Sequence, residues 1–157
     1  MLLFTTKERI EFEQITLLEL AALDHLVEES LAQQFRFVER LVKEYRSGFN
    51  CFNKAGEILI TASLKERVIG IAGLNQNPYV DDPEIGRLRH LYVKSNWRRR
   101  GVGSLLVSQI VKEADQHYQL LTLRTDAVEA DQFYQQLGFK TNPIFSHTTH
   151  HLRLNNK

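Results

Sequence analysis

Two glycines that directly follow a run of arginines constrain this chain more than any other feature of its sequence. A β-rich run over Arg87–Val93 precedes Arg98-Arg99-Arg100-Gly101-Val102-Gly103, and an apolar stripe at helical spacing follows within Ser104–His117. Strand, glycine turn and helix in this order leave the first backbone amides of the helix without partners inside it. Because glycine has no side chain, an anion can approach those amides closely. The order predicts an α/β unit with an anion site at the turn.

Apolar patterns before this unit predict helices and a hairpin. Apolar residues recur at helical spacing as far as Tyr45, which indicates two helices or one bent pair. A capping box at Thr16–Glu19 is expected to begin them, and Ser47-Gly48 to end them. Two β-rich runs, Glu57–Leu64 and Arg67–Leu74, then predict an antiparallel hairpin.

The sequence after this strand–turn–helix unit predicts one more helix, with strands before and after it. Leu120–Thr125 is typical of a strand. Asp126 with Glu129 is expected to cap a helix that Gly138 ends. Phe139–Leu154 then predicts two short strands.

Length and composition place the chain among ordinary globular proteins. It has 157 residues, 43% of them apolar, and we expect a single domain over residues 1–157. Cys51 is the only cysteine, so a disulfide scaffold within the chain is excluded. No apolar run is long enough to span a membrane, and no signal peptide is recognisable. The cytoplasm is therefore the expected location.

Charge is unevenly distributed along the chain. The formal net charge is +1, which does not indicate a nucleic-acid or membrane partner. Residues 85–112 contain no acidic side chain. The basic residues of this stretch are Arg87, Arg89, Lys94, Arg98, Arg99, Arg100 and Lys112. We therefore expect an anionic ligand in this part of the chain.

The glycine turn suits a diphosphate but fits neither common nucleotide motif. Backbone amides at Gly101 and Gly103 together with the arginines supply both hydrogen bonds and positive charge. There is no Gly-Lys-Ser/Thr of a phosphate-binding NTPase loop, and no third glycine at the spacing of the dinucleotide fingerprint.

The motifs resemble the GNAT superfamily of acyl-CoA-dependent N-acetyltransferases, whose signature is R/Q-x-x-G-x-G/A between a strand and a helix. Arg98-x-x-Gly101-x-Gly103 matches it, and a second family element, A-x-x-F-Y-x-x-x-G-F, is present as Ala130-x-x-Phe133-Tyr134-x-x-x-Gly138-Phe139. The resemblance covers nearly the whole chain. It implies an α/β, GNAT-like three-layer fold with a central mixed, mostly antiparallel twisted sheet flanked by helices.

The resemblance also implies where acetyl-CoA binds. The amide of Val93 and those of residues 99–104 would hold the pantetheine and pyrophosphate. The acetyl carbonyl would lie in the gap where the fourth and fifth strands diverge, near the Val93 amide, which would stabilise the developing oxyanion. Leu91 to Val93 would line the thioester, and Arg98 would lie beside the phosphates. The expected binding residues are Leu91, Tyr92, Val93, Arg98, Arg99, Arg100, Gly101, Val102, Gly103 and Ser104.

Two residues are candidates for catalysis. Tyr134 matches the family tyrosine that protonates the departing thiolate, although it would equally serve as a packing residue beside Phe133. His90 is the nearest titratable candidate for the base that deprotonates the amine. Some relatives carry a glutamate on the fourth strand where this chain has Arg87, and many have an asparagine where it has Ala127.

The implied reaction is direct transfer of an acetyl group to a primary amine within a ternary complex, without a metal. The acceptor is a small molecule or a protein. Acidic residues near the N-terminus would attract a cationic acceptor, such as a polyamine, an aminoglycoside, or a protein terminus or lysine, but they equally fit solvated helix faces. These acidic residues are Glu8, Glu11, Glu13, Glu19, Asp24, Glu28 and Glu29. A non-catalytic acyl-CoA sensor or interaction module is the alternative hypothesis, and a homodimer is a further expectation from the family.

The C-terminal histidines invite a metal site that strand geometry disfavours. His147 and His151 would share one face of a strand while His150 points to the other, so the imidazoles would not converge.

Overall fold

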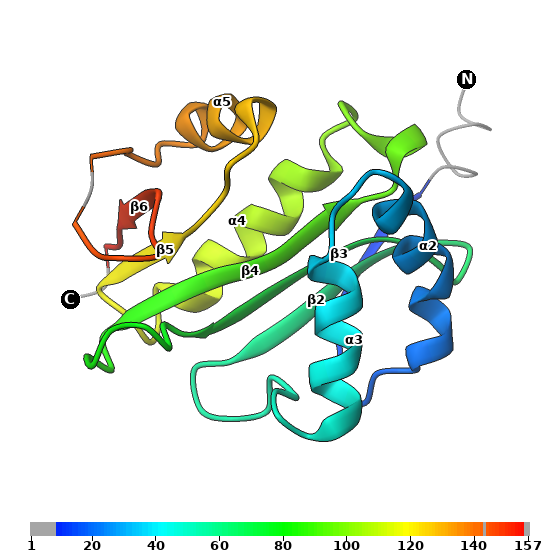
Figure 1. Ribbon diagram of the computed structural model, residues 1–157, viewed down its shortest axis with the longest axis horizontal. Coiled ribbons are helices and arrows are strands. Elements are labelled where there is room, and N and C mark those ends of the chain that lie inside the picture. Colours follow the sequence, from blue (N-terminus) through cyan, green and yellow to red (C-terminus); the bar gives the residue numbers. More distant parts are fainter. Residues whose placement is uncertain (1–8, 143, 156–157) are drawn as a thin grey trace.

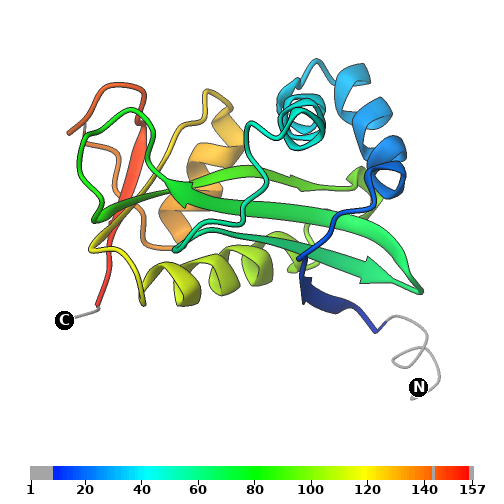
Figure 2. The ribbon, with the colours of Figure 1, turned by 90° about the horizontal axis from the view of Figure 1, so that it is seen from below.

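Strands and helices alternate in the way the sequence predicts. The computed structural model describes residues 9–142 and 144–155, whose strands form one mixed sheet with helices on both faces (Figures 1 and 2). The strands are β1 (Glu11–Gln14), β2 (Ile58–Leu64), β3 (Arg67–Gln76), β4 (Ile85–Val93), β5 (Leu120–Leu123) and β6 (His150–Arg153). The α-helices are α2 (Asp24–Ala32), α3 (Phe37–Ser47), α4 (Val102–Ala114) and α5 (Val128–Gln136). Two 3-10 helices, η1 (Leu20–Leu23) and η2 (Ser95–Trp97), precede α2 and α4. In these residues no helix is long and apolar enough to cross a bilayer.

The strands lie in the sheet in the order in which they occur in the sequence, from β1 to β6. Each neighbouring pair is antiparallel except β4 and β5, which are parallel. A parallel pair needs a crossover connection, and α4 supplies it. The predicted fold class, a mixed and mostly antiparallel sheet flanked by helices, is therefore confirmed.

Each face of the sheet carries its own apolar core. On one face, α4 packs Leu106 and Ile110 against β2 and β3, which contribute Ile60 and Ala72. On the other face, α2 and α3 cover a separate core that includes Leu59 of β2 (Figure 2). β2 and β3 are buried on both faces, which explains why their sequences are continuous apolar runs rather than alternating ones.

The first helix begins later than the capping box predicts. Thr16 lies in a bend, the 3-10 helix η1 begins at Leu20, and Glu19 makes no side-chain cap. Ile15 donates its amide to the Leu59 carbonyl at 2.8 Å, so pairing with β2 extends past β1. The amide of Leu18 then donates a hydrogen bond to the Tyr45 hydroxyl oxygen at 2.9 Å. Residues 16–19 are thus the connection from the edge strand to the helices.

The predicted start of α5 and the predicted strands after it also need correction. Ala127 occupies the N-cap position without a side-chain cap, because the Asp126 carboxylate lies 3.7 Å from the Arg124 guanidinium instead. Of the two strands expected within 139–154, β6 forms, while Lys140 makes only an isolated bridge to His151. Pro143 lies outside the described residues. The predicted ends of α3 and α5 are confirmed, since the glycines at 48 and 138 have φ of 83° and 100°.

Close packing across the sheet predicts a graded response at two glycines of β3. A Cβ on Gly73 would lie 2.5 Å from Cε1 of the buried Phe52 ring, whereas a Cβ on Gly70 would lie 3.0 Å from the flexible end of Leu106. We expect Gly73→Ala to lower the free energy of unfolding by about 1–3 kcal/mol, and Gly70→Ala to lower it by less. Urea denaturation of both variants measures the difference. A larger loss at Gly70 would contradict this packing.

Candidate functional site

β4 and β5 pair over a short length and then diverge. Ile85, Gly86 and Arg87 lie opposite Leu120, Leu121 and Thr122, and no later residue of β4 pairs with β5. Figure 1 shows the chain after β5 leading away from β4 toward α5. From Leu88 to Val93, the edge of β4 that faces β5 therefore has no strand partner. A gap between two strands exposes peptide groups that a ligand can bind.

β4 carries one residue more than β3 just before its end. Arg89 lies opposite Gly73 and Tyr92 lies opposite Ile71. Between these two pairs, β4 therefore has two intervening residues and β3 has one. His90, within the irregular stretch, has a φ of 62° in the left-handed region. An extra residue of this kind reverses which side chains point to which face.

This extra residue sets the surroundings of the β4 end. Leu88, before it, and Leu91 and Val93, after it, all pack in the core on the α4 face, while Tyr92 packs in the core under α2 and α3. Strict alternation from Leu88 would have placed Tyr92 on the α4 face. The side chains of Leu91 and Val93 therefore lie on the α4 face, whereas the Tyr92 side chain lies on the opposite face.

The peptide groups of Val93 point toward the gap. Lys94 donates to the Ile69 carbonyl at 2.7 Å, which makes the preceding pair, Val93 and Gly70, a non-hydrogen-bonded pair. In such a pair, the N–H and C=O point away from the neighbouring strand. The Val93 carbonyl accepts a hydrogen bond from Arg98 Nε at 2.8 Å. Its N–H is thus directed into the gap.

The glycine turn ends where α4 begins with free amides. Gly101 is the N-cap, with a φ of 88° and no side-chain cap. The first amide bonded to it is that of Leu105, at 3.0 Å from the Gly101 carbonyl, so those of residues 102–104 lack an intrahelical acceptor. The first turn of α4 contains no acidic residue, and Arg98, Arg99 and Arg100 are all exposed. Free amides, the positive end of the helix dipole and three exposed guanidinium groups are features typical of an anion site.

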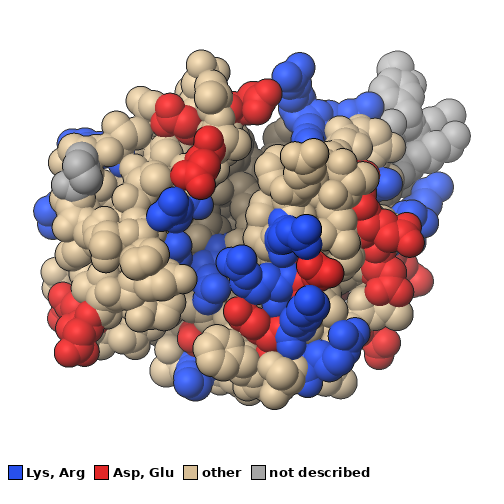
Figure 3. All heavy atoms as spheres, viewed as in Figure 1, with Lys and Arg blue, Asp and Glu red and all other residues tan. Residues whose placement is uncertain are grey.

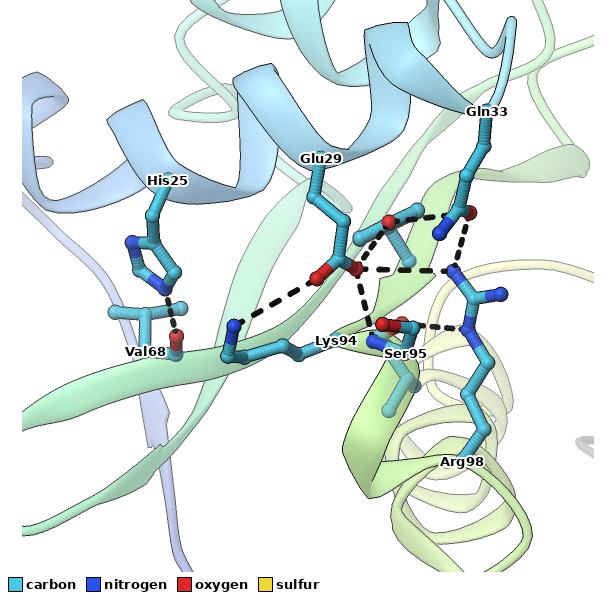
Figure 4. A network of polar contacts seen from close by, with 9 residues as sticks. His25, Glu29, Gln33, Val68, Lys94, Ser95 and Arg98 are labelled. Carbon is cyan, nitrogen blue, oxygen red and sulfur yellow. Dashed lines mark hydrogen bonds and ion pairs between the residues drawn. The ribbon is translucent and has the colours of Figure 1, made fainter.

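Arg98 is held by neighbours from α2 and β4 (Figure 4). Besides bonding to Val93, its guanidinium donates to Gln33 Oε1 at 2.9 Å and lies 4.0 Å from the Glu29 carboxylate. It also lies over the Tyr92 ring, 5.0 Å from the centroid. Arg98 therefore ties the turn to α2. The Arg100 guanidinium stacks on the Trp97 ring at 4.7 Å.

The Glu29 carboxylate is the centre of this network. It accepts hydrogen bonds from the Tyr92 hydroxyl and, at 2.8 Å, from the Ser95 amide, and the Lys94 ammonium lies 3.6 Å away. Burial by itself would raise the pKa of Glu29, but the two hydrogen bonds and the Lys94 charge outweigh it and hold the pKa below the usual 4.5. Burial and the same carboxylate raise the pKa of Tyr92. Both groups thus keep the protonation states that the hydrogen bond requires.

The second motif meets the first at the end of β4. A Cβ on Gly103 would lie 3.4 Å from Cζ of Phe133 in α5 and 3.7 Å from Cγ2 of Val93. Tyr134, next to Phe133, is buried, with its ring 5.0 Å from Phe133 and 5.5 Å from Phe139. Burial raises the pKa of its hydroxyl, so the group stays protonated. The structure brings the glycine turn, Val93 and the Phe133-Tyr134 pair together.

His90 lies apart from this group. Its Nδ1–H donates to the Phe37 carbonyl of α3 at 2.9 Å, and its ring meets the edge of Phe52. Its Nε2 is buried and, within the described residues, has no hydrogen-bond partner. Burial and the positive charge of Arg89 lower its pKa to about 3. A group that resists protonation so strongly is a poor acceptor for the proton of an amine, so its surroundings argue against the role of base.

The C-terminal histidines have separate partners. His147 stacks on Tyr79 with centroids 4.3 Å apart, and His151 Nε2 lies 3.1 Å from Asn142 Oδ1. His150 Nε2 lies 2.9 Å from the Asp131 carboxylate. In residues 9–142 and 144–155, no group of three metal-ligating side chains converges.

Glu29, which the motifs do not mark, should stabilise the fold in a pH-dependent way. Its lowered pKa means that its ionised form adds stability above pH 4.5, and that this stability is lost as the pH falls through the folded-state value. We expect Glu29→Gln to cost roughly 1–2 kcal/mol at pH 7, with the difference from wild type shrinking at acidic pH. Urea denaturation from pH 7 to pH 3 measures it, with the exposed neighbour Glu28→Gln as control. An equal cost at both ends of that range would show that the carboxylate charge is not responsible.

Comparisons with known proteins agree with this geometry. A model of the acetyltransferase (GNAT) family matches residues 21–139. Among solved structures, a candidate acetyltransferase from Exiguobacterium sp. 255-15 is 28% identical, with a TM-score of 0.80 over 92% of this chain and 93% of that one. An acetyltransferase of the GNAT family from Staphylococcus aureus Mu50 is 15% identical, with a TM-score of 0.74 over 94% and 100% of the two chains.

A GNAT family N-acetyltransferase from Escherichia coli, solved in complex with CoA, is 16% identical, with a TM-score of 0.67 over 94% of this chain and 83% of that one. The search of curated proteins found no match. The family model spans well over half of the chain and includes both motifs that meet at Val93. The chain therefore belongs to the GNAT family of acetyltransferases.

Proposed function

We propose that this protein transfers the acetyl group of acetyl-CoA to a primary amine by direct attack in a ternary complex. The observation that carries the proposal is the junction of three features at the gap between β4 and β5. These are the inward N–H of Val93, the free amides of the α4 N-terminus and the buried Tyr134. The E. coli family member solved with CoA adds support for the ligand.

The residues present fit coenzyme A. Amides of the turn and of the first turn of α4, including Val102, Gly103 and Ser104, would bind the pyrophosphate, with Arg99 and Arg100 supplying charge. The open edge of β4 from Leu91 to Val93 would pair with the amide groups of pantetheine. Arg98, held by Glu29 and Gln33, would support the turn from behind as well as lend it charge.

Acetyl-CoA supplies an acetyl group activated as a thioester. The N–H of Val93 points into the gap and would donate to the carbonyl oxygen as negative charge develops there. The protonated hydroxyl of Tyr134 would donate to the sulfur that departs. With His90 buried and bonded to Phe37, and with Arg87 where some relatives carry a glutamate, the amine proton would leave through water.

Coenzyme A binding should depend on Gly101 for a reason separate from stability. A Cβ there meets no atom within 4 Å, but the φ of 88° is strained for any other residue. We expect Gly101→Ala to shift the turn and to weaken acetyl-CoA binding roughly tenfold or more, as befits the loss of one charge-assisted hydrogen bond. Isothermal titration measures the affinity.

Gly48 offers a matched control. It has a φ of 83° and equally open surroundings, but it ends α3 far from the turn along the chain. Gly48→Ala should lose similar stability and keep the affinity. A folded wild-type protein that does not bind acetyl-CoA would overturn the proposed function.

Tyr134→Phe should separate chemistry from packing. The phenylalanine ring keeps the contacts with Phe133 and Phe139, while the proton donor is lost. We expect kcat to fall roughly a hundredfold while the affinity for acetyl-CoA stays within about twofold. CoA release under saturating acetyl-CoA, together with titration, measures both. Equal loss of turnover and affinity would assign Tyr134 a packing role, and unchanged turnover would exclude it as the acid.

A further inference from the structure

Arginines gather on the face of the gap that is opposite α4. Arg89 lies 3.9 Å from Glu44 of α3, so its side chain is on the α2 and α3 face, and Arg87, two residues earlier, shares that face. Arg124 directly follows β5, across the gap, and its charge acts on Arg87. Figure 3 views this face and shows a hollow near its centre with Lys and Arg side chains beside it.

Arg89 and Arg124 each have one carboxylate at ion-pair distance, whereas Arg87 has none among the described residues. The Glu44 oxygen nearest Arg89 is beyond hydrogen-bond length and is itself buried without a hydrogen-bond partner. Arg124 has one exposed carboxylate, that of Asp126, at 3.7 Å. For Arg87, no described carboxylate lies within 4.0 Å, although its residue is only 8% exposed. A buried guanidinium without a counter-charge is costly unless a ligand supplies that charge.

Rings and a backbone carbonyl hold Arg87 in place. Its guanidinium lies over the Tyr79 ring at 4.8 Å and donates to the His147 carbonyl at 2.8 Å. Tyr79 in turn stacks on His147. One hydrogen bond leaves most of the donors of the guanidinium fork available. Burial and the charges of Arg89 and Arg124 lower the pKa of Arg87 to about 10, which still leaves it charged at neutral pH.

We propose that the acceptor is an amine that also carries a carboxylate or phosphate, which Arg87 binds together with Arg89 and Arg124 on the α2 and α3 face of the gap. The proposal rests on the proposed acetyl transfer and names its substrate class. Planar guanidinium groups bind both anions through paired hydrogen bonds. The hollow in Figure 3 lies on the α2 and α3 face, so we place the approach of the acceptor to the gap on this side, opposite α4.

Of the acidic residues near the N-terminus, Glu8 lies outside the described residues, and Glu11, Glu13 and Glu29 do not offset this charge. Glu11 and Glu13 lie on β1, the edge strand, and three strands separate β1 from the gap beyond β4. Glu29 is engaged with Tyr92 and Ser95. Glu11 and Glu13 therefore lie away from the gap, and the charge of Glu29 is used within its own network.

Sets of amines test the proposal, and the members of each set are similar in length but differ in charge. 4-Aminobutanoate, 4-aminobutanamide and 1,4-diaminobutane differ in the charge of the end remote from the reacting amine. Ethanolamine and its O-phosphate make the corresponding comparison of a neutral end with a phosphate. Glycylglycine and its amide extend the reach. We expect an anionic member to have a kcat/KM at least roughly tenfold above its neutral and cationic partners. Its KM should rise with salt, while that of the neutral partner should not.

Variants assign the effect to residues. Arg87→Gln and, as a more exposed site that is safer for folding, Arg124→Gln should raise the KM for the anionic amine roughly tenfold while leaving acetyl-CoA affinity unchanged. Arg67→Gln, an exposed arginine at the start of β3, is the control and should change neither.

Neutral or cationic amines that react as well as the anionic ones would overturn the acceptor class while leaving acetyl transfer intact. So would a protein that binds acetyl-CoA and acetylates no anionic amine. Loss of acetyl-CoA binding itself, by contrast, would overturn the proposed function.

Discussion

The extra residue at His90 in β4 is the constraint on which the site depends. Before it, Leu88 faces α4, and after it, Leu91 and Val93 face α4. Tyr92 therefore points to the other face of the sheet, toward α2. The left-handed φ of a histidine is costly, and the hydrogen bond to Phe37 and the packing on Phe52 offset that cost. The buried imidazole of His90, a candidate base from its sequence position, thus holds the irregular stretch of β4 against α3 and Phe52.

From this residue follows the connection between the two faces of the sheet. The Tyr92 hydroxyl finds Glu29 on α2, and the same carboxylate holds the Ser95 amide just before the glycine turn. Arg98 completes the link by bonding to Val93 and Gln33. The turn that offers amides to an anion is therefore fixed by a helix on the opposite side of the sheet from α4. Such support keeps free amides in place without a ligand.

Local signals in the sequence were sufficient for much of the fold. The hairpin of β2 and β3, the strand β4, the glycine turn and the helix α4 follow from apolar period and glycine position. The gap between β4 and β5 expected from the resemblance is also present, since β4 pairs with β5 only over Ile85–Arg87. Helix starts were less predictable. The Leu18 amide donates a hydrogen bond to Tyr45, 27 positions away, and the Asp126 carboxylate pairs with Arg124 rather than capping α5.

The side chains that support the site could not be read from the sequence for the same reason. Glu29 and Gln33 are separated from Ser95 and Arg98 by more than sixty positions, and neither stands in a recognisable motif. On β4 itself, no glycine or proline marks the register shift that turns Tyr92 away from α4, although Gly73 of β3 lies directly opposite Arg89 where the shift begins. The one sequence signal that pointed beyond the motifs was the absence of acidic residues over 85–112, a stretch that includes the buried Arg87 and the half-buried Arg89 of β4.

The two faces of the sheet also differ in how readily their residues can be substituted during evolution. The anion site is built from β4, the turn, α4 and α5, whereas the opposite face of the gap is bordered by α3, by the loop of Tyr79 and by the segment of His147. Loops and surface helices accept substitution more readily than strands that share a core. Descendants of such a chain can therefore change which molecules they modify while the machinery that holds the donor is inherited unaltered.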